Sequence, residues 1–186
     1  HLVYAVNYPA VGAVNDGRGT CSGVLIAPQW VLTAGHCVGE IYDPTLGITI
    51  PAPTSMRFIP AANAQSQWSS GGYVADDWFP HENWTGDLGD AFDIGLIHLQ
   101  SPVPSGTATP AQRFYGSSEL TLLGHIAGYG VTNSAATGIT LLDQLFPDRQ
   151  RRAGQNRIDL LGSQRSDILS EFGSVARANQ FILTDM

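Results

Sequence analysis

The sequence predicts an all-β protein, built as a sandwich or a barrel. Its 21 glycines and 11 prolines are scattered along 186 residues instead of being gathered in one linker. Short runs rich in Val, Ile, Leu and Thr separate them, a pattern typical of many short strands joined by turns. Hydrophobic residues make up 43% of the chain, which is enough for one large core or two small ones.

The first part of the chain predicts a strand followed by a hairpin. Residues 8–14 form the first expected strand, and residues 15–19 form a turn, because Asp and Gly pairs tolerate positive φ. Two more strands are expected at 21–26 and 30–33. The second of these ends just before His36, so that side chain would stand at the end of an apolar strand.

The middle of the chain predicts one long loop and three further strands. Residues 39–53 are rich in Pro, Gly and Thr, so we expect a loop there in which only 48–50 is extended. Strands are expected at 55–59 and 72–78, with a polar surface loop between them. The apolar run at 94–99 predicts a buried strand.

The remaining residues predict a linker and a second β region. Residues 101–110 are dense in Pro, Ser and Thr, as in a segment that crosses between two halves of a protein. Strands are expected at 120–130 and 156–161, and residues 148–152 predict an exposed charged loop in preference to a protease processing site. A short helix capped by Ser166 or Asp167 is predicted from apolar residues at helical spacing, namely Ile168, Leu169, Phe172, Val175 and Ala176.

Charge and hydropathy exclude several classes of partner. The formal net charge of −7 argues against a phosphate-binding surface, and no stretch interleaves basic and aromatic residues. We therefore expect no nucleic-acid partner. No apolar run approaches the roughly 20 residues that span a bilayer, so no membrane partner is expected. A monomer without a cofactor is the favoured interpretation.

The two cysteines, Cys21 and Cys37, begin and end the strand pair that presents His36. In an exported protein they would close a short loop, and a loop of about 15 residues contributes about 3 kcal/mol. Two cysteines and one histidine do not make a four-ligand metal set, so we expect a disulfide, no metal, and a secreted or periplasmic location. Several carboxylates could hold Ca²⁺, although we interpret them as a solvated loop: Asp76, Asp77, Glu82, Asp87 and Asp90.

His36 and Asp93 are the candidate catalytic pair. An acid on one ring nitrogen fixes the tautomer of a histidine and leaves the other nitrogen free to take a proton. Asp93 stands just ahead of an apolar strand, where an unpaired charge would be costly. We expect His81, His98 and His125 to be structural, because none has a comparable setting.

The segments around this pair resemble the trypsin/chymotrypsin-like serine peptidases. The resemblance covers residues 9–130 and is strongest in Thr33-Ala34-Gly35-His36-Cys37, with Asp93-Ile94-Gly95-Leu96 downstream and Gly128-Tyr129-Gly130 entering the second half. It implies an all-β, two-barrel antiparallel fold with His36 as the base and Asp93 as its orienting acid. The first barrel would be complete at 1–100, with a crossing linker at 101–118 and a partial second barrel at 119–186.

The nucleophile of that family is missing from the sequence. No Gly-Asp-Ser-Gly-Gly segment occurs, and Ser69 and Ser70, although followed by two glycines, precede Asp93. The other candidates lack the flanking residues: Ser117, Ser118, Ser163, Ser166, Ser170 and Ser174. We expect the natural protein to continue past Met186, or a second chain to complete it, and this chain alone to be inactive.

Two functions from different classes follow from these patterns. The first is a secreted serine endopeptidase that acts on proteins or peptides through a Ser-His-Asp triad whose serine lies beyond this chain. The alternative is a non-catalytic homologue that keeps the barrel as a binding module. A different serine hydrolase fold is disfavoured, because the sequence has no Gly-x-Ser-x-Gly segment.

Overall fold

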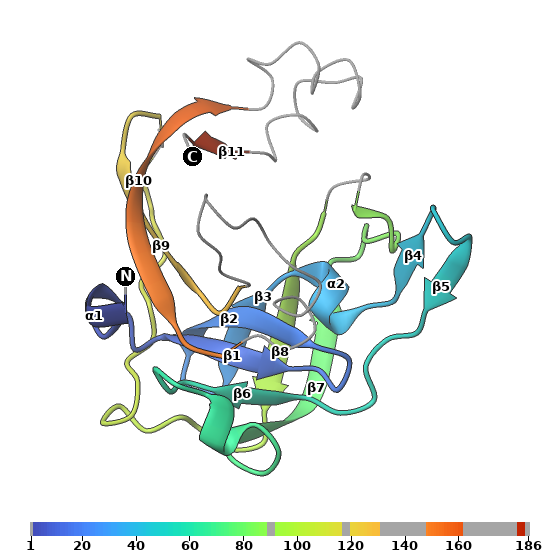
Figure 1. Ribbon diagram of the computed structural model, residues 1–186, viewed down its shortest axis with the longest axis horizontal. Coiled ribbons are helices and arrows are strands. Elements are labelled where there is room, and N and C mark those ends of the chain that lie inside the picture. The colour runs from blue at the N-terminus through green and yellow to red at the C-terminus, as the bar shows by residue number, and fades with distance from the viewer. Residues whose placement is uncertain (1, 89–91, 117–119, 131–147, 162–181, 185–186) are drawn as a thin grey trace.

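The computed structural model describes residues 2–88, 92–116, 120–130, 148–161 and 182–184 (Figure 1). The all-β prediction is confirmed. In the described residues the helices are one turn each, namely α1 (Leu2–Ala5), α2 (Gly35–Val38) and the 3₁₀ turn η1 (Gln65–Gln67). None of these helices is long and apolar enough to cross a membrane.

Six strands close into an antiparallel barrel in the order β1-β2-β3-β8-β7-β6. Their bounds are β1 Val11–Asn15, β2 Thr20–Ala27, β3 Trp30–Thr33, β6 Arg57–Ile59, β7 Tyr73–Pro80 and β8 Gly95–Leu99. Closure leaves no unpaired edge in this sheet. The prediction of a complete first barrel therefore matches the sheet that these residues form.

Alternation along the strands fills the barrel. In β8 every second residue is buried, so Ile97 and Leu99 point inward while His98 points out. They meet Leu25 and Val31 from the β2–β3 hairpin and Phe58 from β6, all fully buried. The core thus fixes the register of β3 against β8, which pairs Thr33 with Gly95 and brings the histidine segment beside the aspartate segment.

The region expected as a long loop contains a hairpin. Strands β4 (Ile41–Asp43) and β5 (Ile48–Ile50) pair antiparallel, and in Figure 1 the hairpin stands out from the barrel beside α2. Its turn is closed by the Asp43 side chain, which accepts hydrogen bonds from the backbone N–H groups of Thr45 and Leu46. Only the 48–50 part was predicted, because Pro and Gly dominate the composition of the stretch.

A second sheet of three strands follows the barrel, in the order β11-β10-β9. Its bounds are β9 Leu123–Gly128, β10 Arg152–Leu161 and β11 Ile182–Thr184. Strand β10 begins four residues earlier than the predicted 156–161 strand, because residues 152–157 pair along the whole of β9. The helix predicted after Ser166 lies outside the described residues.

The prediction of an exposed charged loop at 148–152 is wrong at Arg151. This side chain is 4% exposed, and its guanidinium donates to the carbonyls of Ala5 at 3.0 Å and Val11 at 2.6 Å. Charge counting missed this contact, because the partners are backbone carbonyls far away in the sequence. Arg151 therefore ties the N-terminal segment to β10.

Tyr129 joins the second sheet to the barrel. Its backbone N–H donates to the Ser22 hydroxyl at 2.9 Å, and its own hydroxyl donates to the carbonyl of Ala61. Burial raises the pKa of Tyr129 to about 12, so it is a neutral donor at ordinary pH. The domain boundaries after residues 100 and 118 stay predictions.

Candidate active site

The histidine segment is placed by β3 and by a close approach of two chain segments. Strand β3 ends at Thr33, whose hydroxyl donates to the Ser22 carbonyl at 2.9 Å, and α2 starts two residues later. A Cβ added at Gly35 would lie 3.1 Å from the Ile94 nitrogen and 3.3 Å from a carboxylate oxygen of Asp93. Glycine thus lets this turn approach the Asp93 segment closely.

Asp93 lies in a tight turn just before β8. The Ile94 N–H donates to the Phe92 carbonyl at 2.7 Å, so the turn is centred on Asp93, and Phe92 takes a left-handed conformation with φ of 57°. The buried strand therefore begins at Gly95, two residues after the aspartate. This turn, which the sequence pattern did not reveal, presents the carboxylate to the histidine segment.

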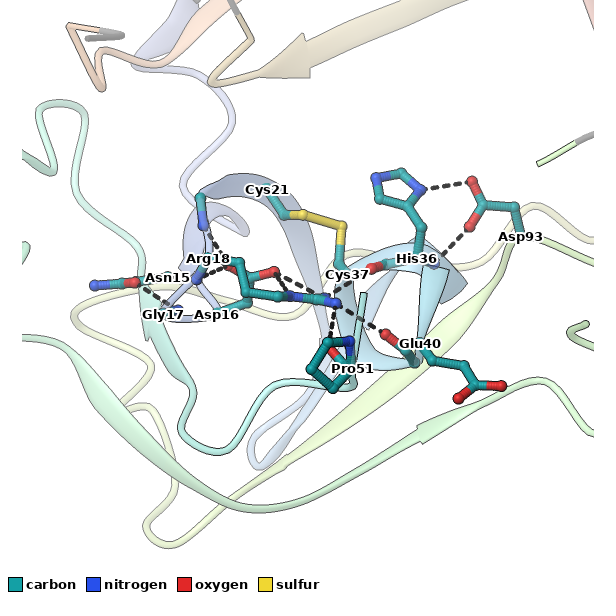
Figure 2. A network of polar contacts seen from close by, with 12 residues as sticks. Asn15, Asp16, Gly17, Arg18, Cys21, His36, Cys37, Glu40, Pro51 and Asp93 are labelled. Atoms are coloured by element: carbon teal, nitrogen blue, oxygen red, sulfur yellow. Dashed lines mark hydrogen bonds and ion pairs between the residues drawn. A yellow bond between two sulfur atoms is a disulfide. The ribbon is translucent and has the colours of Figure 1, made fainter. Parts of the chain in front are cut away.

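The structure brings His36 and Asp93 together through two hydrogen bonds (Figure 2). Nδ1 of the imidazole lies 2.8 Å from Oδ2 of Asp93, and the backbone N–H of His36 donates to Oδ1 at 2.8 Å. Nε2 has no hydrogen-bond partner among the described residues. With the Nδ1 proton held by the carboxylate, Nε2 is the ring nitrogen left to accept a proton.

The environment of Asp93 favours its charged form. Burial on its own would raise the pKa of this carboxyl, but the hydrogen bonds from the His36 ring and backbone bring the pKa below its ordinary value of 3.8. Its side chain is 31% exposed and that of His36 is 37% exposed. The pair is therefore partly shielded and still reachable from solvent.

Cys21 and Cys37 form a disulfide that joins β2 to α2 directly after His36. Their Cα atoms are 6.3 Å apart, and the two residues lie 16 positions apart in the sequence. Both sulfurs and a ring nitrogen of His36 lie within 4.8 Å of one another. Because the two sulfurs are bonded to each other, neither offers a thiolate to a metal ion.

Sequence reasoning missed a third attachment of α2, the ion pair of Arg18 and Asp16. The guanidinium lies 2.9 Å from the carboxylate and also donates to the His36 carbonyl at 2.8 Å. Figure 2 shows this network on the side of α2 away from Asp93. No motif marks such an arginine, because its partners on α2 are backbone carbonyls.

A cavity of about 740 Å³ lies beside the pair. Asp93 and Phe92 form part of its wall, Val24 and Leu32 line it from the barrel, and Ala127 lines it from β9. Most of this lining is apolar. The orienting acid thus borders a cavity lined by residues of both the barrel and the second sheet.

His98 also has an acid partner, which its setting in the sequence did not indicate, and the prediction that it is structural stays a prediction. Its Nδ1 lies 2.6 Å from a carboxylate oxygen of Asp76, and its ring packs edge-on against Trp30. The partner was missed because no motif flanks Asp76, and the pairing of β7 with β8 that brings it to His98 is not visible in the sequence. This pair joins side chains alone and lies on the outside of the barrel.

The remaining sequence candidates contact neighbouring side chains or the backbone. His125 lies between the Tyr8 hydroxyl at 2.6 Å and the Gln155 amide at 2.8 Å, and His81 stacks on Phe92. Among the carboxylates considered for Ca²⁺, Asp76 pairs with His98, while Asp77 accepts a hydrogen bond from a backbone N–H of its own strand. Asp90 lies outside the described residues.

Comparison with known proteins adds two kinds of similarity. The model of the family described as Trypsin matches residues 3–156. Complement C1s-1 subcomponent from Mus musculus is 30% identical over 146 residues, which cover 76% of this chain and 20% of that protein. Calcium-dependent serine proteinase from Mesocricetus auratus is 33% identical over 130 residues, covering 67% and 18% respectively.

The fold is similar to that of a solved structure, neuropsin, described as a serine protease expressed in the limbic system of mouse brain. The TM-score is 0.63 at 20% identity, and the match covers 96% of this chain and 70% of neuropsin. The two-barrel, all-β prediction is thus supported by a known fold. The chain itself spans about a fifth of the length of the two relatives named above.

Proposed function

Because the chain belongs to the trypsin family, we propose that it supplies two of the three catalytic groups of a serine endopeptidase, His36 as the base and Asp93 as its orienting acid. The observation that carries the proposal is the pair of hydrogen bonds, 2.8 Å each, that joins Asp93 to the ring and to the backbone of His36. The order in the chain, histidine before aspartate, also fits the family.

In the proposed reaction His36 acts twice. Nε2 takes the proton of a serine hydroxyl as the serine attacks the peptide carbonyl, and the imidazolium then gives that proton to the departing amine. Asp93 keeps the Nδ1 proton in place and stabilises the imidazolium. A carboxyl whose pKa lies below 3.8 stays ionised throughout the neutral range, which this role requires.

The nucleophile in this proposal comes from outside the 186 residues. The sequence contains no Gly-Asp-Ser-Gly-Gly segment, and the oxyanion-hole donors of the family belong to the same segment. The substrates are proteins or peptides. The disulfide supports a location outside the cytoplasm, secreted or periplasmic, because such bonds persist in oxidising compartments.

Mutation of the histidine in the natural gene product tests the proposal. We expect His36→Ala to lower kcat/KM for peptide hydrolysis by about 10⁴-fold or more. The matched control is His98→Ala, which removes the other acid-paired histidine and is expected to leave the rate within about twofold of wild type. Retained hydrolysis in a folded His36→Ala protein would overturn the assignment.

A second function rests on the missing nucleophile segment. A chain that keeps the barrel and the His36–Asp93 pair without a serine would act as a binding module and not as an enzyme. A natural gene product that lacks Gly-x-Ser-Gly-Gly, and shows no hydrolysis in the same assay, supports this alternative. Hydrolysis that depends on His36 excludes it.

A further inference from the structure

The guanidinium of Arg18 connects three separate parts of the chain. Nη2 donates to the His36 carbonyl at 2.8 Å, and Nη1 donates to the carbonyls of Gly39 and Pro51, both at 3.1 Å. Figure 2 shows Arg18 at the centre of this network. The first two carbonyls belong to the end of α2, and the third follows the β4–β5 hairpin.

The carbonyls of His36 and Gly39 need partners that α2 cannot supply. A helix of four residues has one internal turn, and its last carbonyls have no following N–H groups to accept from. A helix this short is also unstable by itself, because the backbone entropy lost in forming the first turn outweighs the hydrogen bond gained. A cation at the C-terminal end satisfies the carbonyls and interacts favourably with the helix dipole.

Arg18 is itself held rigidly. Asp16 is 5% exposed, and its Oδ2 accepts a hydrogen bond from Nε of Arg18 at 3.0 Å. The other oxygen, Oδ1, accepts from the backbone N–H groups of Arg18 and Gly19. With its Nε side fixed on a buried carboxylate, the planar guanidinium presents both terminal nitrogens to the carbonyls in one orientation.

His36 is consequently held on both sides of its Cα atom. Asp93 accepts from its backbone N–H at 2.8 Å, and Arg18 donates to its carbonyl at 2.8 Å. The Cys21–Cys37 disulfide limits the distance between α2 and the start of β2, next to Arg18. A single covalent link still lets a short helical turn rotate. The bonds from Arg18 add the attachment points that oppose this rotation.

We propose that Arg18 is a positioning residue for His36, which fixes α2 so that the imidazole and the backbone N–H can both reach the Asp93 carboxylate. This inference rests on the proposed function, since it assigns a role within the same site. Arg18 touches no reacting atom. Its effect passes through the two peptide units of the histidine, and it depends on the forked shape of the side chain as well as on its charge.

The test compares three variants of the natural gene product by NMR. Arg18→Ala removes both the forked guanidinium and its charge, whereas Arg18→Lys keeps the positive charge without the forked shape. Arg57→Ala is the matched control. Arg57 donates to the carbonyls of Ser70 and Gly71 elsewhere on the barrel, at 3.5 and 3.3 Å. Two signals are followed: the solvent exchange of the His36 Nδ1 proton, and the titration midpoint of the Asp93 carboxyl carbon.

In Arg18→Ala we expect proton exchange about tenfold faster and an Asp93 midpoint that moves up toward 3.8. Arg18→Lys should show the faster exchange as well, because one ammonium cannot serve three carbonyls and a carboxylate together. Arg57→Ala should match wild type. If Arg18→Ala does not fold, the lysine variant alone decides.

An Arg18→Lys protein with both signals unchanged would overturn the proposal, as would a folded Arg18→Ala protein that matches wild type. These readouts need no peptidase activity. A natural gene product that fails to hydrolyse peptides while Arg18→Lys still disturbs the pair would overturn the proposed function alone. Hydrolysis by wild type with kcat unaffected in Arg18→Lys would instead overturn the positioning role alone.

Discussion

Asp93 accepts two hydrogen bonds from a single residue, His36, one from the ring and one from the backbone, each 2.8 Å long. The carboxylate therefore fixes the orientation of the imidazole relative to its own peptide unit. The pair of His98 and Asp76 on the barrel exterior joins side chains alone, at 2.6 Å. This difference separates a pair built to hold one geometry from one that links two neighbouring strands.

Replacement of Asp93 by asparagine should remove most of the proposed activity. The amide has nearly the same shape, but it does not stabilise an imidazolium and can favour the wrong tautomer, so kcat for peptide hydrolysis should fall by about 10⁴-fold. The comparison is Asp76→Asn, which disrupts the exterior pair and should leave kcat unchanged. An equal effect of the two substitutions would contradict the account.

The stability of the chain should fall in acid partly through Asp93. The pKa of the Asp93 carboxyl is below 3.8 in the folded protein, so the charged form of this group favours folding. Its contribution to stability is fully present at pH values above its pKa in the unfolded chain. The contribution is lost as the pH falls through its pKa in the folded protein. Urea unfolding between about pH 7 and about pH 2 measures it. Wild type should lose more stability than Asp93→Asn below about pH 4; parallel curves would refute this.

The disulfide should contribute substantially to stability. It closes a loop across 16 residues, for which the chain-entropy model gives about 3 kcal/mol. The double variant Cys21→Ser/Cys37→Ser should therefore unfold at a lower denaturant concentration, with a free energy of unfolding reduced by about this amount. A loss below about 1 kcal/mol would contradict this prediction, and would mean that the segment is already restrained without the disulfide.

A side chain at Gly95 should destabilise the contact between α2 and β8. A Cβ there would lie 2.4 Å from Cγ2 of Val38 and 3.1 Å from the Ala34 carbonyl, so Gly95→Ala would push α2 away from β8. We expect a loss of about 1–3 kcal/mol in the free energy of unfolding. Gly106→Ala is the control, because a Cβ at Gly106 meets nothing within 4 Å. Equal stability of the two variants would show that the contact relaxes without cost.

Much of the barrel could be predicted from local patterns. The alternation of apolar and polar residues, together with turn residues, predicted strands near their observed positions. The segment before His36 indicated the end of β3. The β4 strand was missed although Ile41 is β-branched, because Asp43 and the Pro, Gly and Thr residues that follow it are typical of a loop. Pairing between strands, which decides such cases, is not a local property of the sequence.

The His36–Asp93 pair was predictable from the sequence, whereas the His98–Asp76 pair and the contacts of side chains with the backbone were not. His36 and Asp93 follow from chemistry and from a family resemblance. Arg18 and Arg151 donate to backbone carbonyls far away in sequence, and a carbonyl carries no residue signature. The turn that centres on Asp93 was hidden for a similar reason, since the left-handed φ of Phe92 is not expected for an aromatic residue.

The most direct test of the central claim is labelling of the natural gene product with a fluorophosphonate, followed by mass spectrometry to locate the modified residue. We expect one labelled serine outside residues 1–186, and loss of that label in His36→Ala. A label on a serine within the 186 residues, or labelling that persists without His36, would contradict it.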